Sequence, residues 1–191
     1  IIKNSLPQLQ VSPSYMLATP MMALKNAAET ANEQGFIPII LSDTLEGEAH
    51  VEGKKMAELA LQIKKNKKYK NINLNKPIIL LSGGETTVTV KGEGKGGRNT
   101  EFILSMAINL DKMKGISALA IDTDGIDGIE DNAGAYISEN TLNKASSSNK
   151  NPENYLSNND SYTFFKSIGD LIYTSPTLTN VNDFRAVLIE P

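Results

Sequence analysis

The stretch IILLSGGETTVTVKGEGKGGRNTEFILSMAINL, residues 78–110, decides the fold class of this chain. It opens with an apolar run of strand length, passes through a Ser-Gly-Gly-Glu segment typical of a turn, and continues as an alternating run at residues 86–90. A glycine-rich loop follows, and residues 100–110 then carry apolar side chains at helical spacing. We therefore predict a β-hairpin of strands 78–81 and 86–90, followed by a loop and a helix.

The flanking sequence alternates strand and helix patterns in the same way. Towards the N-terminus the pattern predicts a strand at 15–19, a helix over 23–31 that stops at Gly35, a buried parallel strand at 36–41, a loop at 42–47 and a helix to about residue 65. Towards the C-terminus it predicts a buried strand at 117–121, an acidic loop at 122–134, a helix before the polar loop 146–151, a helix at 162–168, and strands at 171–174 and 185–189. This order is typical of an α/β protein, and the break at 71–76 predicts a boundary between two α/β units.

The composition excludes several classes of protein and site. The chain has 191 residues, with 19 Lys and Arg against 22 Asp and Glu, no Cys and one His. This excludes a disulfide framework, thiolate metal ligands and a His-based zinc site, and the mild acidity argues against nucleic-acid binding. No apolar run approaches the roughly 20 residues of a membrane span. We expect a cytoplasmic protein with no nucleic-acid or membrane partner, and the start without Met predicts that the chain continues upstream.

Only two of the 19 basic residues are arginines, Arg98 and Arg185. Arginine has a planar fork of donors that lysine cannot replace at a site for carboxylate or phosphate. Arg98 lies in the glycine-rich loop, since six of the 14 glycines fall between residues 81 and 99. Glycines before a helix let backbone N–H groups approach an anion, so the loop is a candidate anion site, and a flexible connection is the alternative. Arg185 is expected only to brace the turn after Asp183.

The same loop matches the dinucleotide-binding fingerprint as Gly92-x-Gly94-x-x-Gly97, followed at a distance by Asp122. Taken alone, this match indicates a nicotinamide-dependent oxidoreductase. However, the strand before the loop is predicted to be the second arm of a hairpin rather than the first strand of a βαβ unit, and basic side chains crowd the turn. The loop is also not a Walker A motif, because no Gly-Lys-Ser/Thr sequence follows the glycines. The match is weak evidence for a nicotinamide site.

Five carboxylates lie within ten residues after the buried strand 117–121: Asp122, Asp124, Asp127, Glu130 and Asp131. Open α/β sheets bind ligands at strand ends of this kind. Clustered carboxylates suit Mg²⁺ together with phosphate oxygens, which makes Asp122, Asp124 and Asp127 candidate metal ligands. One of them could instead accept the proton of an attacking hydroxyl. The alternative is an Asx-rich turn in which Asp131 or Asn132 caps a following helix.

Two further segments could carry function. His50, the single histidine, lies beside Glu48 on a predicted helix surface, where a histidine is more often an ion-pair partner than a catalyst. The polar run Thr177–Asp183 could line the floor of a pocket, or it could bond its own backbone as a turn.

Taken together, four segments resemble the glycerate 2-kinase family, whose C-terminal portion is called the MOFRL domain and whose members were formerly named hydroxypyruvate reductases. The segments are SDTLEGEA (42–49), LSGGETTVTVKGEGKGGRNTE (81–101), IDTDGIDGIEDNAGA (121–135) and TLTNVND (177–183). The resemblance implies the end of a Rossmann-like parallel-sheet domain at residues 1–75, followed by a mixed-sheet α/β MOFRL domain at residues 76–191.

The resemblance also implies a reaction, the ATP- and Mg²⁺-dependent phosphorylation of D-glycerate at its 2-hydroxyl to 2-phosphoglycerate. It implies that Arg98 is the active-site arginine, and the residue chemistry adds Asp122 and Asp124 as catalytic candidates. The candidates for binding substrate or phosphate are Gly83, Gly84, Glu85, Lys95, Gly96, Gly97, Asn99, Thr179 and Asn180. The N-terminal half of the family, with its catalytic Lys, is absent from this chain, so we expect the chain alone to be inactive.

Several alternatives stay open at this point. His50 stands where relatives commonly carry Arg, and Ser175 and Leu178 stand at positions that look like Gly in the family. The rival hypotheses are an NAD(P)H-dependent hydroxypyruvate reductase and a non-catalytic binding module or fragment. The choice between 2- and 3-phosphoglycerate as product, and the formation of a homodimer, are also left open.

Overall fold

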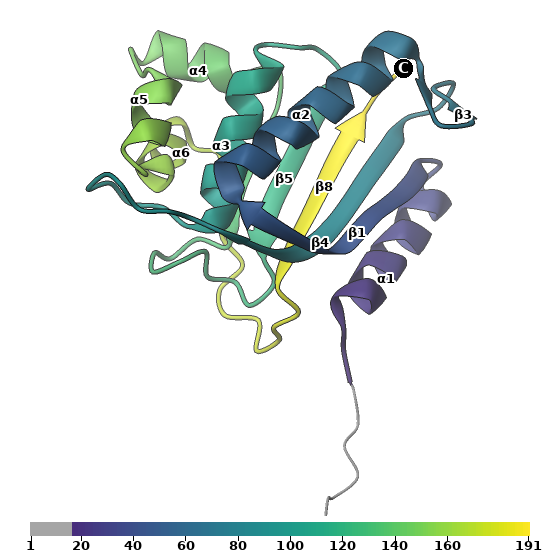
Figure 1. Ribbon diagram of the computed structural model, residues 1–191, viewed down its shortest axis with the longest axis horizontal. Coiled ribbons are helices and arrows are strands. Elements are labelled where there is room, and N and C mark those ends of the chain that lie inside the picture. Colours follow the sequence, from purple (N-terminus) through teal and green to yellow (C-terminus); the bar gives the residue numbers. More distant parts are fainter. Residues whose placement is uncertain (1–16) are drawn as a thin grey trace, which may run out of the picture.

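The computed structural model describes residues 17–191, which form a six-stranded mixed sheet with helices on both faces (Figure 1). The strand order is β1-β4-β8-β5-β6-β7; β1 and β4 are parallel, and every other neighbouring pair is antiparallel. The strands of this sheet are β1 (Ile37–Glu48), β4 (Ile78–Thr87), β5 (Ile116–Asp122), β6 (Gly134–Ile137), β7 (Leu171–Ile172) and β8 (Asp183–Ile189). A separate small hairpin is formed by β2 (Lys68–Tyr69) and β3 (Ile72–Asn73). The helices are α1 (Pro20–Glu33), α2 (Ala49–Asn66), α3 (Arg98–Leu110), α4 (Thr141–Ser147), α5 (Pro152–Ser157) and α6 (Ser161–Ile168).

Helices α2 and α3 cover one face of the sheet (Figure 1). Buried and half-exposed residues alternate along β5 and β8, and buried side chains such as Ala118 and Val187 join the core beneath these two helices. Helix α1 packs on β1 and β4 from the opposite face, where Leu24 lies beside Gly83. Helices α4, α5 and α6 pack along α3, and α6 also contacts β7. Within residues 17–191, no helix is both long and apolar enough to cross a membrane.

The α/β class with a mixed sheet is confirmed, and several elements lie where the sequence pattern predicts them. These elements are the helices α1, α2, α3 and α6 and the strands β5, β7 and β8. The strand expected at 15–19 falls partly outside the described residues, and residues 17–19 form no strand. The domain boundary expected at 71–76 stays a prediction; β1 before it and β4 after it are neighbours in one sheet.

The predicted hairpin at 78–90 is wrong, because β4 is one continuous strand that passes through the Gly83-Gly84 pair. These glycines serve the pairing of β4 with β1 rather than a turn. Gly84 has a φ of +104°, and a Cβ there would overlap the backbone of Leu45. The predicted loop 42–47 is also wrong, because β1 continues through it with register shifts between Ile40 and Leu45. The last residues of β1 and of β4 therefore extend past the packed core.

Three other expectations differ from the structure. The acidic loop leads first into the strand β6, so neither Asp131 nor Asn132 is a helix cap. The helix predicted before residue 146 follows β6 as α4. β1 is half-exposed rather than buried, because it forms an edge of the sheet. Helix α5 has no counterpart among the predicted elements; Asn151 caps it, accepting from the N–H of Asn154 at 3.0 Å.

Helices α2 and α3 lie close together at Gly53. A Cβ at this position would overlap the backbone carbonyl of Phe102. Alanine is about 1 kcal/mol better than glycine inside a helix, yet we expect Gly53→Ala to lower the free energy of unfolding by about 2 kcal/mol, because the two helices must move apart. Chemical denaturation measures this change. Asn26→Ala on the exposed face of α1 is the control and is expected to be neutral or slightly stabilising.

Candidate active site

Two strands and a helix place their ends together at one edge of the sheet. β4 and β5 run in the same direction on either side of β8, since both are antiparallel to it. β5 therefore ends at Asp122 directly opposite Asp183, the residue at which β8 begins. Both side chains are buried on the face that α3 covers, and α3 begins at Arg98. Residues far apart in the sequence are thereby brought within hydrogen-bond distance.

Arg98 is the centre of this cluster, because each of its three side-chain nitrogens faces a different carboxylate. Nε donates to Asp183 Oδ1 at 2.8 Å, and Nη2 donates to Asp122 Oδ2 at 2.6 Å. Nη1 lies 3.5 Å from Glu85 Oε1, on the last part of β4. The Asp122 and Asp183 side chains are almost fully buried, whereas 24% of the Arg98 side chain and 55% of the Glu85 side chain are exposed. The guanidinium is therefore fixed on its inner side and accessible on its outer side.

The charges in this cluster alter the protonation of its members. Burial raises the pKa of Asp122 to about 6; the neighbouring carboxylates of Asp124 and Asp183 add to this increase, and Arg98 opposes it. Burial alone would lower the pKa of Arg98, but its bonds and charge interactions with Asp183, and the charge of Asp122, raise it overall. Arg98 therefore stays charged, while Asp122 exchanges its proton close to neutral pH.

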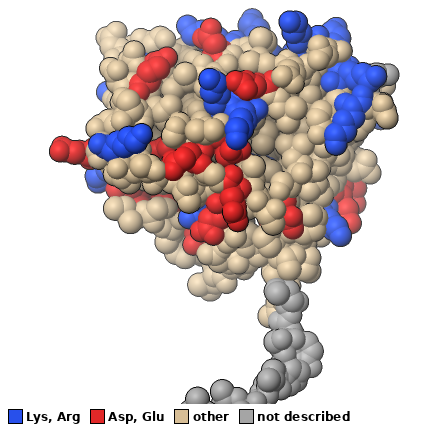
Figure 2. All heavy atoms as spheres, viewed as in Figure 1, with Lys and Arg blue, Asp and Glu red and all other residues tan. Residues whose placement is uncertain are grey.

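A groove of about 560 Å³ opens in front of Arg98. Its walls come from the ends of β1 and β4, the glycine-rich loop and the acidic loop, through the residues Glu46, Glu85, Thr86, Thr87, Val88, Val90, Gly96, Gly97, Arg98 and Gly128. Acidic side chains gather in the middle of the face shown in Figure 2, and a group of basic side chains lies directly beside them. Among the described residues that line the groove, Arg98 is the one with a positive charge.

Asp183 and Arg185 belong to the site, although the sequence pattern does not assign them to it. Asp183 accepts from Arg98, and the same oxygen accepts from Asn99 Nδ2 at 2.8 Å. Arg185 is fully buried on β8 and donates to the other Asp183 oxygen. The scarcity of arginine and the position of Asp183 at the end of the Thr177–Asp183 run were the available signals.

Asp127, a predicted metal ligand, instead binds the N-terminus of α3. Its side chain is buried, and it accepts from the backbone N–H groups of Asn99 at 2.9 Å and Thr100 at 2.8 Å. The Thr100 hydroxyl donates to it as well, at 2.8 Å. An aspartate from the acidic loop therefore occupies the anion position that the dipole of α3 creates.

The glycine-rich loop also packs more tightly than an open anion cradle would. A Cβ on Gly92 or Gly94 would overlap residues Asn158 and Asp160, and one on Gly96 would overlap Ser161. The loop is bonded to the same segment, since the Gly94 N–H donates to the Asn158 carbonyl at 3.0 Å. These glycines allow close packing of the loop on the α5–α6 segment, which gives the dinucleotide fingerprint a structural explanation.

The remaining predicted residues lie around the Arg98 cluster at different depths. Gly83 accepts from Arg185 through its carbonyl, and Gly97 packs against Asp127. Lys95 pairs with Glu130 at 3.3 Å and points along the surface. Of the predicted residues, Glu85, Gly96 and Gly97 line the groove. Gly83, Gly84 and Asn99 lie behind it, and Lys95 is not among the lining residues.

Thr179 and Asn180 lie on the loop before β8, which packs against the start of the acidic loop. The Thr177 hydroxyl donates to the Thr123 carbonyl at 2.5 Å, and Asn180 Nδ2 lies 3.5 Å from Asp124 Oδ2. Asp124 in turn donates its backbone N–H to Asp122 Oδ1 at 3.1 Å. Asn180 therefore borders the site through Asp124 rather than through Arg98, whereas Thr179 is bonded to Thr177 within the same loop.

His50 lies outside this cluster, in agreement with its interpretation as an ion-pair partner. Its Nδ1 is 3.4 Å from Glu101 Oε1 and 4.0 Å from Glu48 Oε2. Burial raises the pKa of Glu101, and the bonds of Glu101 with Asn159 and His50 oppose this increase. These residues border a separate pocket of about 370 Å³ that shares no lining residue with the Arg98 groove.

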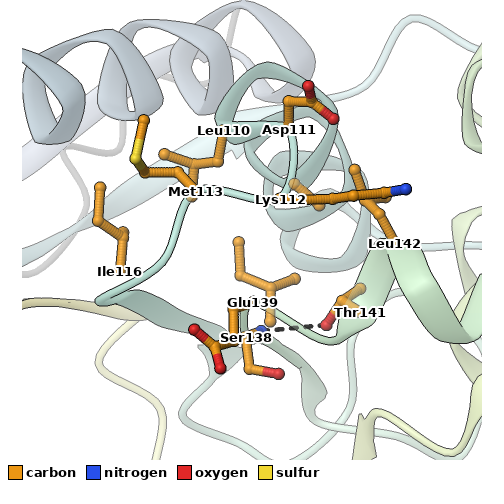
Figure 3. Close-up of a pocket in the computed structure, with 11 residues that line it drawn as sticks. Leu110, Asp111, Lys112, Met113, Ile116, Ser138, Glu139, Thr141 and Leu142 are labelled. Carbon is orange, nitrogen blue, oxygen red and sulfur yellow. Dashed lines mark hydrogen bonds between the residues drawn. The ribbon is translucent and has the colours of Figure 1, made fainter.

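A further pocket, shown in Figure 3, lies at the other end of α3 from Arg98. Leu110, Met113 and Ile116 line one side, and the turn in which Ser138 N donates to Thr141 Oγ1 at 3.0 Å lines the other. Its volume is about 10 Å³, which is room for about one water molecule. This pocket is too small for a substrate.

The carboxylates of this cluster do not fit a resident Mg²⁺ site. Both oxygens of Asp122 are hydrogen-bonded, one by Arg98 and one by the N–H of Asp124. Asp127 is occupied by the N-terminus of α3. Within the described part of the chain, no three His, Asp or Glu side chains are grouped as metal ligands. These carboxylates alone therefore do not supply the ligands of a Mg²⁺ ion.

The sequence of this chain is similar to those of several known proteins. A sequence profile described as the MOFRL family matches residues 78–183. A D-glycerate 2-kinase of Thermotoga maritima is 39% identical over 175 residues, which are 92% of this chain and 41% of that protein. A protein of Agrobacterium vitis with the provisional name hydroxypyruvate reductase is 49% identical over 176 residues, 91% of this chain and 39% of that protein.

Two solved structures share the fold. The crystal structure of a glycerate kinase from Thermotoga maritima matches with a TM-score of 0.86 and 37% identity, over 92% of this chain and 41% of that one. The crystal structure of a Pyrococcus horikoshii protein matches with a TM-score of 0.85 and 32% identity, over 99% of this chain and 42% of that one. The chain thus spans about two fifths of the length of these relatives.

Proposed function

Because this chain belongs to the MOFRL family, we propose that it contributes the Arg98 site to a glycerate 2-kinase. Such an enzyme transfers the γ-phosphoryl group of ATP to the 2-hydroxyl of D-glycerate and releases 2-phosphoglycerate and ADP. The observation that carries the proposal is the Arg98 guanidinium, which is held between Asp122 and Asp183 and open to a groove of about 560 Å³. Both substrates present anionic oxygens, and a hydrogen bond from a charged guanidinium to such an oxygen is stronger than one between neutral groups.

Arg98 is proposed to bind an anionic oxygen of the glycerate carboxylate or of the transferring phosphoryl group. Its outer nitrogen, Nη1, lies 3.5 Å from the half-exposed Glu85, which is a long and solvent-screened ion pair. An anion that enters the groove can therefore replace Glu85 at this nitrogen. The two inner nitrogens stay bonded to buried carboxylates, so Arg98 keeps its orientation while a ligand binds.

Asp122 is proposed to accept the proton of the attacking hydroxyl. In this step the 2-hydroxyl oxygen of glycerate forms a bond to the γ-phosphorus, the bond to the bridging oxygen of ADP breaks, and the proton passes to a carboxylate oxygen of Asp122. Asp122 lies behind Arg98 rather than in the lining of the groove, and its Oδ2 accepts from Arg98 Nη2 at 2.6 Å. A carboxylate oxygen has two lone pairs, and the second one on Oδ2 would receive the proton from a ligand that reaches past Arg98. Mg²⁺ would accompany the phosphates of ATP and reduce their negative charge.

The pKa of Asp122 gives this role a pH dependence. The base must be ionised, and its pKa of about 6 means that its ionised fraction falls as the pH drops through that value. We expect kcat/KM of the full-length enzyme to fall about tenfold per pH unit below this point. Asp122→Asn should remove this acidic limb and lower kcat about 100-fold or more. Initial rates of ADP release between pH 5 and pH 8 measure both effects.

Asp131→Asn is the matched control, because it makes the same chemical change in the same loop. Asp131 accepts from the Tyr162 hydroxyl at 2.9 Å and makes no bond to Arg98. We expect this variant to keep both the rate and the acidic limb. An unchanged acidic limb in Asp122→Asn would assign the base to a different group.

Two assays on the full-length protein separate the kinase from the reductase hypothesis. One measures ADP release with D-glycerate and Mg·ATP, and the other measures NADH oxidation with hydroxypyruvate. We expect activity in the first assay and none in the second, because the fingerprint glycines pack on Asn158 and Asp160. Activity confined to the second assay would overturn the proposal.

The third hypothesis, a non-catalytic fragment, is tested on the 191-residue chain itself. Thermal-shift measurements with Mg·ATP and with D-glycerate ask whether this part of the site binds a ligand alone. We expect binding of at least one ligand without turnover, since the chain spans about two fifths of its kinase relatives. Turnover by the chain alone would contradict the expectation that it is inactive in isolation.

A further inference from the structure

We infer that Arg185 is a positioning residue for Arg98 and that it acts through the Asp183 carboxylate. The inference deepens the proposed kinase function and rests on it for its kinetic readout. Arg185 touches neither the groove nor Arg98 directly, so its effect on the reaction must pass through the residue that the two arginines share.

The first observation is the environment of Arg185, which is among the largest fully buried side chains of the described residues. Nη2 donates to Asp183 Oδ2 and, at 3.0 Å, to the Thr86 hydroxyl. Nη1 donates to the Gly83 carbonyl at 3.3 Å, and the guanidinium carbon lies 4.8 Å from the centre of the Phe102 ring. Contacts from β4, β8 and α3 therefore fix this guanidinium.

The second observation is that the two oxygens of Asp183 bind different partners. Oδ1 accepts from Arg98 Nε at 2.8 Å and from Asn99 Nδ2 at 2.8 Å. Oδ2 accepts from Arg185 and from the Thr86 N–H at 3.3 Å. Because a carboxylate is planar, holding Oδ2 also fixes the direction in which Oδ1 meets Arg98.

The third observation is the position of Arg185 on its strand. Asp183, Arg185, Val187 and Ile189 all point into the same buried face, and the last two are apolar core residues. Burying a guanidinium is unfavourable until its partners compensate, and an apolar residue of similar volume is often at least as stable. A role in positioning Arg98 explains why this face carries an ion pair at its groove end and apolar residues elsewhere.

The pair also affects the charge of Arg98. Asp183 is shared between two guanidinium groups, so Arg185 neutralises part of its charge. Without Arg185, the Asp183 carboxylate would lose its charged partner at Oδ2, where only the Thr86 N–H would still hold it. The positive charge that Arg98 presents to an incoming anion would then be both weaker and less well directed.

Kinetics on the full-length protein test this inference through Arg185→Met and Arg185→Lys. We expect Arg185→Met to lower kcat about 100-fold, because a misplaced catalytic group has an effect of this size. The KM for D-glycerate should change much less. Arg185→Lys should bring kcat back to about a tenth of the wild-type value, because lysine returns the charge without the planar fork of donors. A kcat per folded enzyme within about twofold of wild type in Arg185→Met would overturn the inference.

A milder pair of variants decides the question if Arg185→Met does not fold. Thr86→Val keeps the shape of the side chain but removes the hydroxyl that accepts from Arg185. We expect it to lower kcat about fivefold, the equivalent of one lost hydrogen bond. Ser82→Ala on the same strand is the control, because the buried Ser82 hydroxyl has no hydrogen-bond partner among the described residues. Equal rates for Thr86→Val and Ser82→Ala would overturn the inference.

A spectroscopic readout is independent of the kinase reaction. The chain has only two arginines, so ¹⁵N-arginine labelling gives two side-chain Nε–H signals, and Arg98→Lys identifies one of them. We expect Thr86→Val to shift or broaden the Arg98 signal and Ser82→Ala to leave it unchanged. An unaffected Arg98 signal in Thr86→Val would overturn the link through Asp183. If the wild-type protein lacks kinase activity, the proposed function fails while this measurement still tests the link.

Discussion

Arg98→Lys in the full-length enzyme is expected to lower kcat about a thousandfold, which is within the range found when a charged group that stabilises a phosphoryl-transfer transition state is removed. The reason lies in the geometry of the side chain. Arg98 bonds two buried carboxylates with Nε and Nη2 and still presents Nη1 to the groove. A lysine ammonium is one point charge at the end of a flexible stem, so it cannot hold both partners and face a ligand at the same time.

Initial rates of ADP release with saturating D-glycerate and Mg·ATP measure this effect. Lys114→Arg, an exposed exchange of the same two residue types outside the site, is the control and should leave the rate unchanged. Thermal unfolding of both variants checks that the loss of rate does not reflect a loss of fold. Turnover close to wild type in Arg98→Lys would remove Arg98 from the catalytic residues.

Asp127→Ala is expected to lower the free energy of unfolding by about 4 kcal/mol, the largest effect on stability that we predict. The side chain is buried and accepts from the N–H groups of Asn99 and Thr100 and from the Thr100 hydroxyl. Removing it leaves the N–H groups of Asn99 and Thr100 without the carboxylate that accepts from them and removes the negative charge at the N-terminus of α3. Asp127→Asn keeps the shape and one acceptor oxygen, so its effect should be smaller, about 2 kcal/mol.

Urea denaturation measures both changes, with Glu58→Ala on the exposed face of α2 as a control within about 0.5 kcal/mol of wild type. Repeating the measurements with a chelator separates the two interpretations of Asp127. A residue that caps α3 makes the same contribution with and without the chelator. A contribution that disappears on chelation would restore the interpretation of Asp127 as a metal ligand.

Local sequence pattern was sufficient where the structure depends on local periodicity. The apolar residues of α3 recur at helical spacing, and β5 alternates buried and half-exposed residues over Ile116–Asp122. Arg98 could be found because glycines, a helix start and a rare arginine coincide in one loop. Asp122 could be found because it ends a buried strand, where ligands of α/β sheets bind.

The parts that were wrong or missed depend on contacts between distant residues. Gly83-Gly84 has the local signature of a turn, and only the close approach of Leu45 on β1 explains why a strand passes through it. Asp127 has the chemistry of a metal ligand, and only the fold shows that it meets the N-terminus of α3. The sequence pattern predicts for Arg185 only a role in bracing the turn after Asp183, because its partner Thr86 lies 99 positions away. Nothing in a local pattern specifies such partners.

The position of β8 has a consequence for the synthesis of this protein. β8 lies in the sheet between β4 and β5, although it is made after both of them. Until residues 183–189 leave the ribosome, β4 and β5 each keep an unpaired edge, which is a hazard for aggregation in a nascent chain. The same strand brings Asp183 and Arg185 to Arg98. Closing the sheet and assembling the site are therefore one event, which waits for the synthesis of β8.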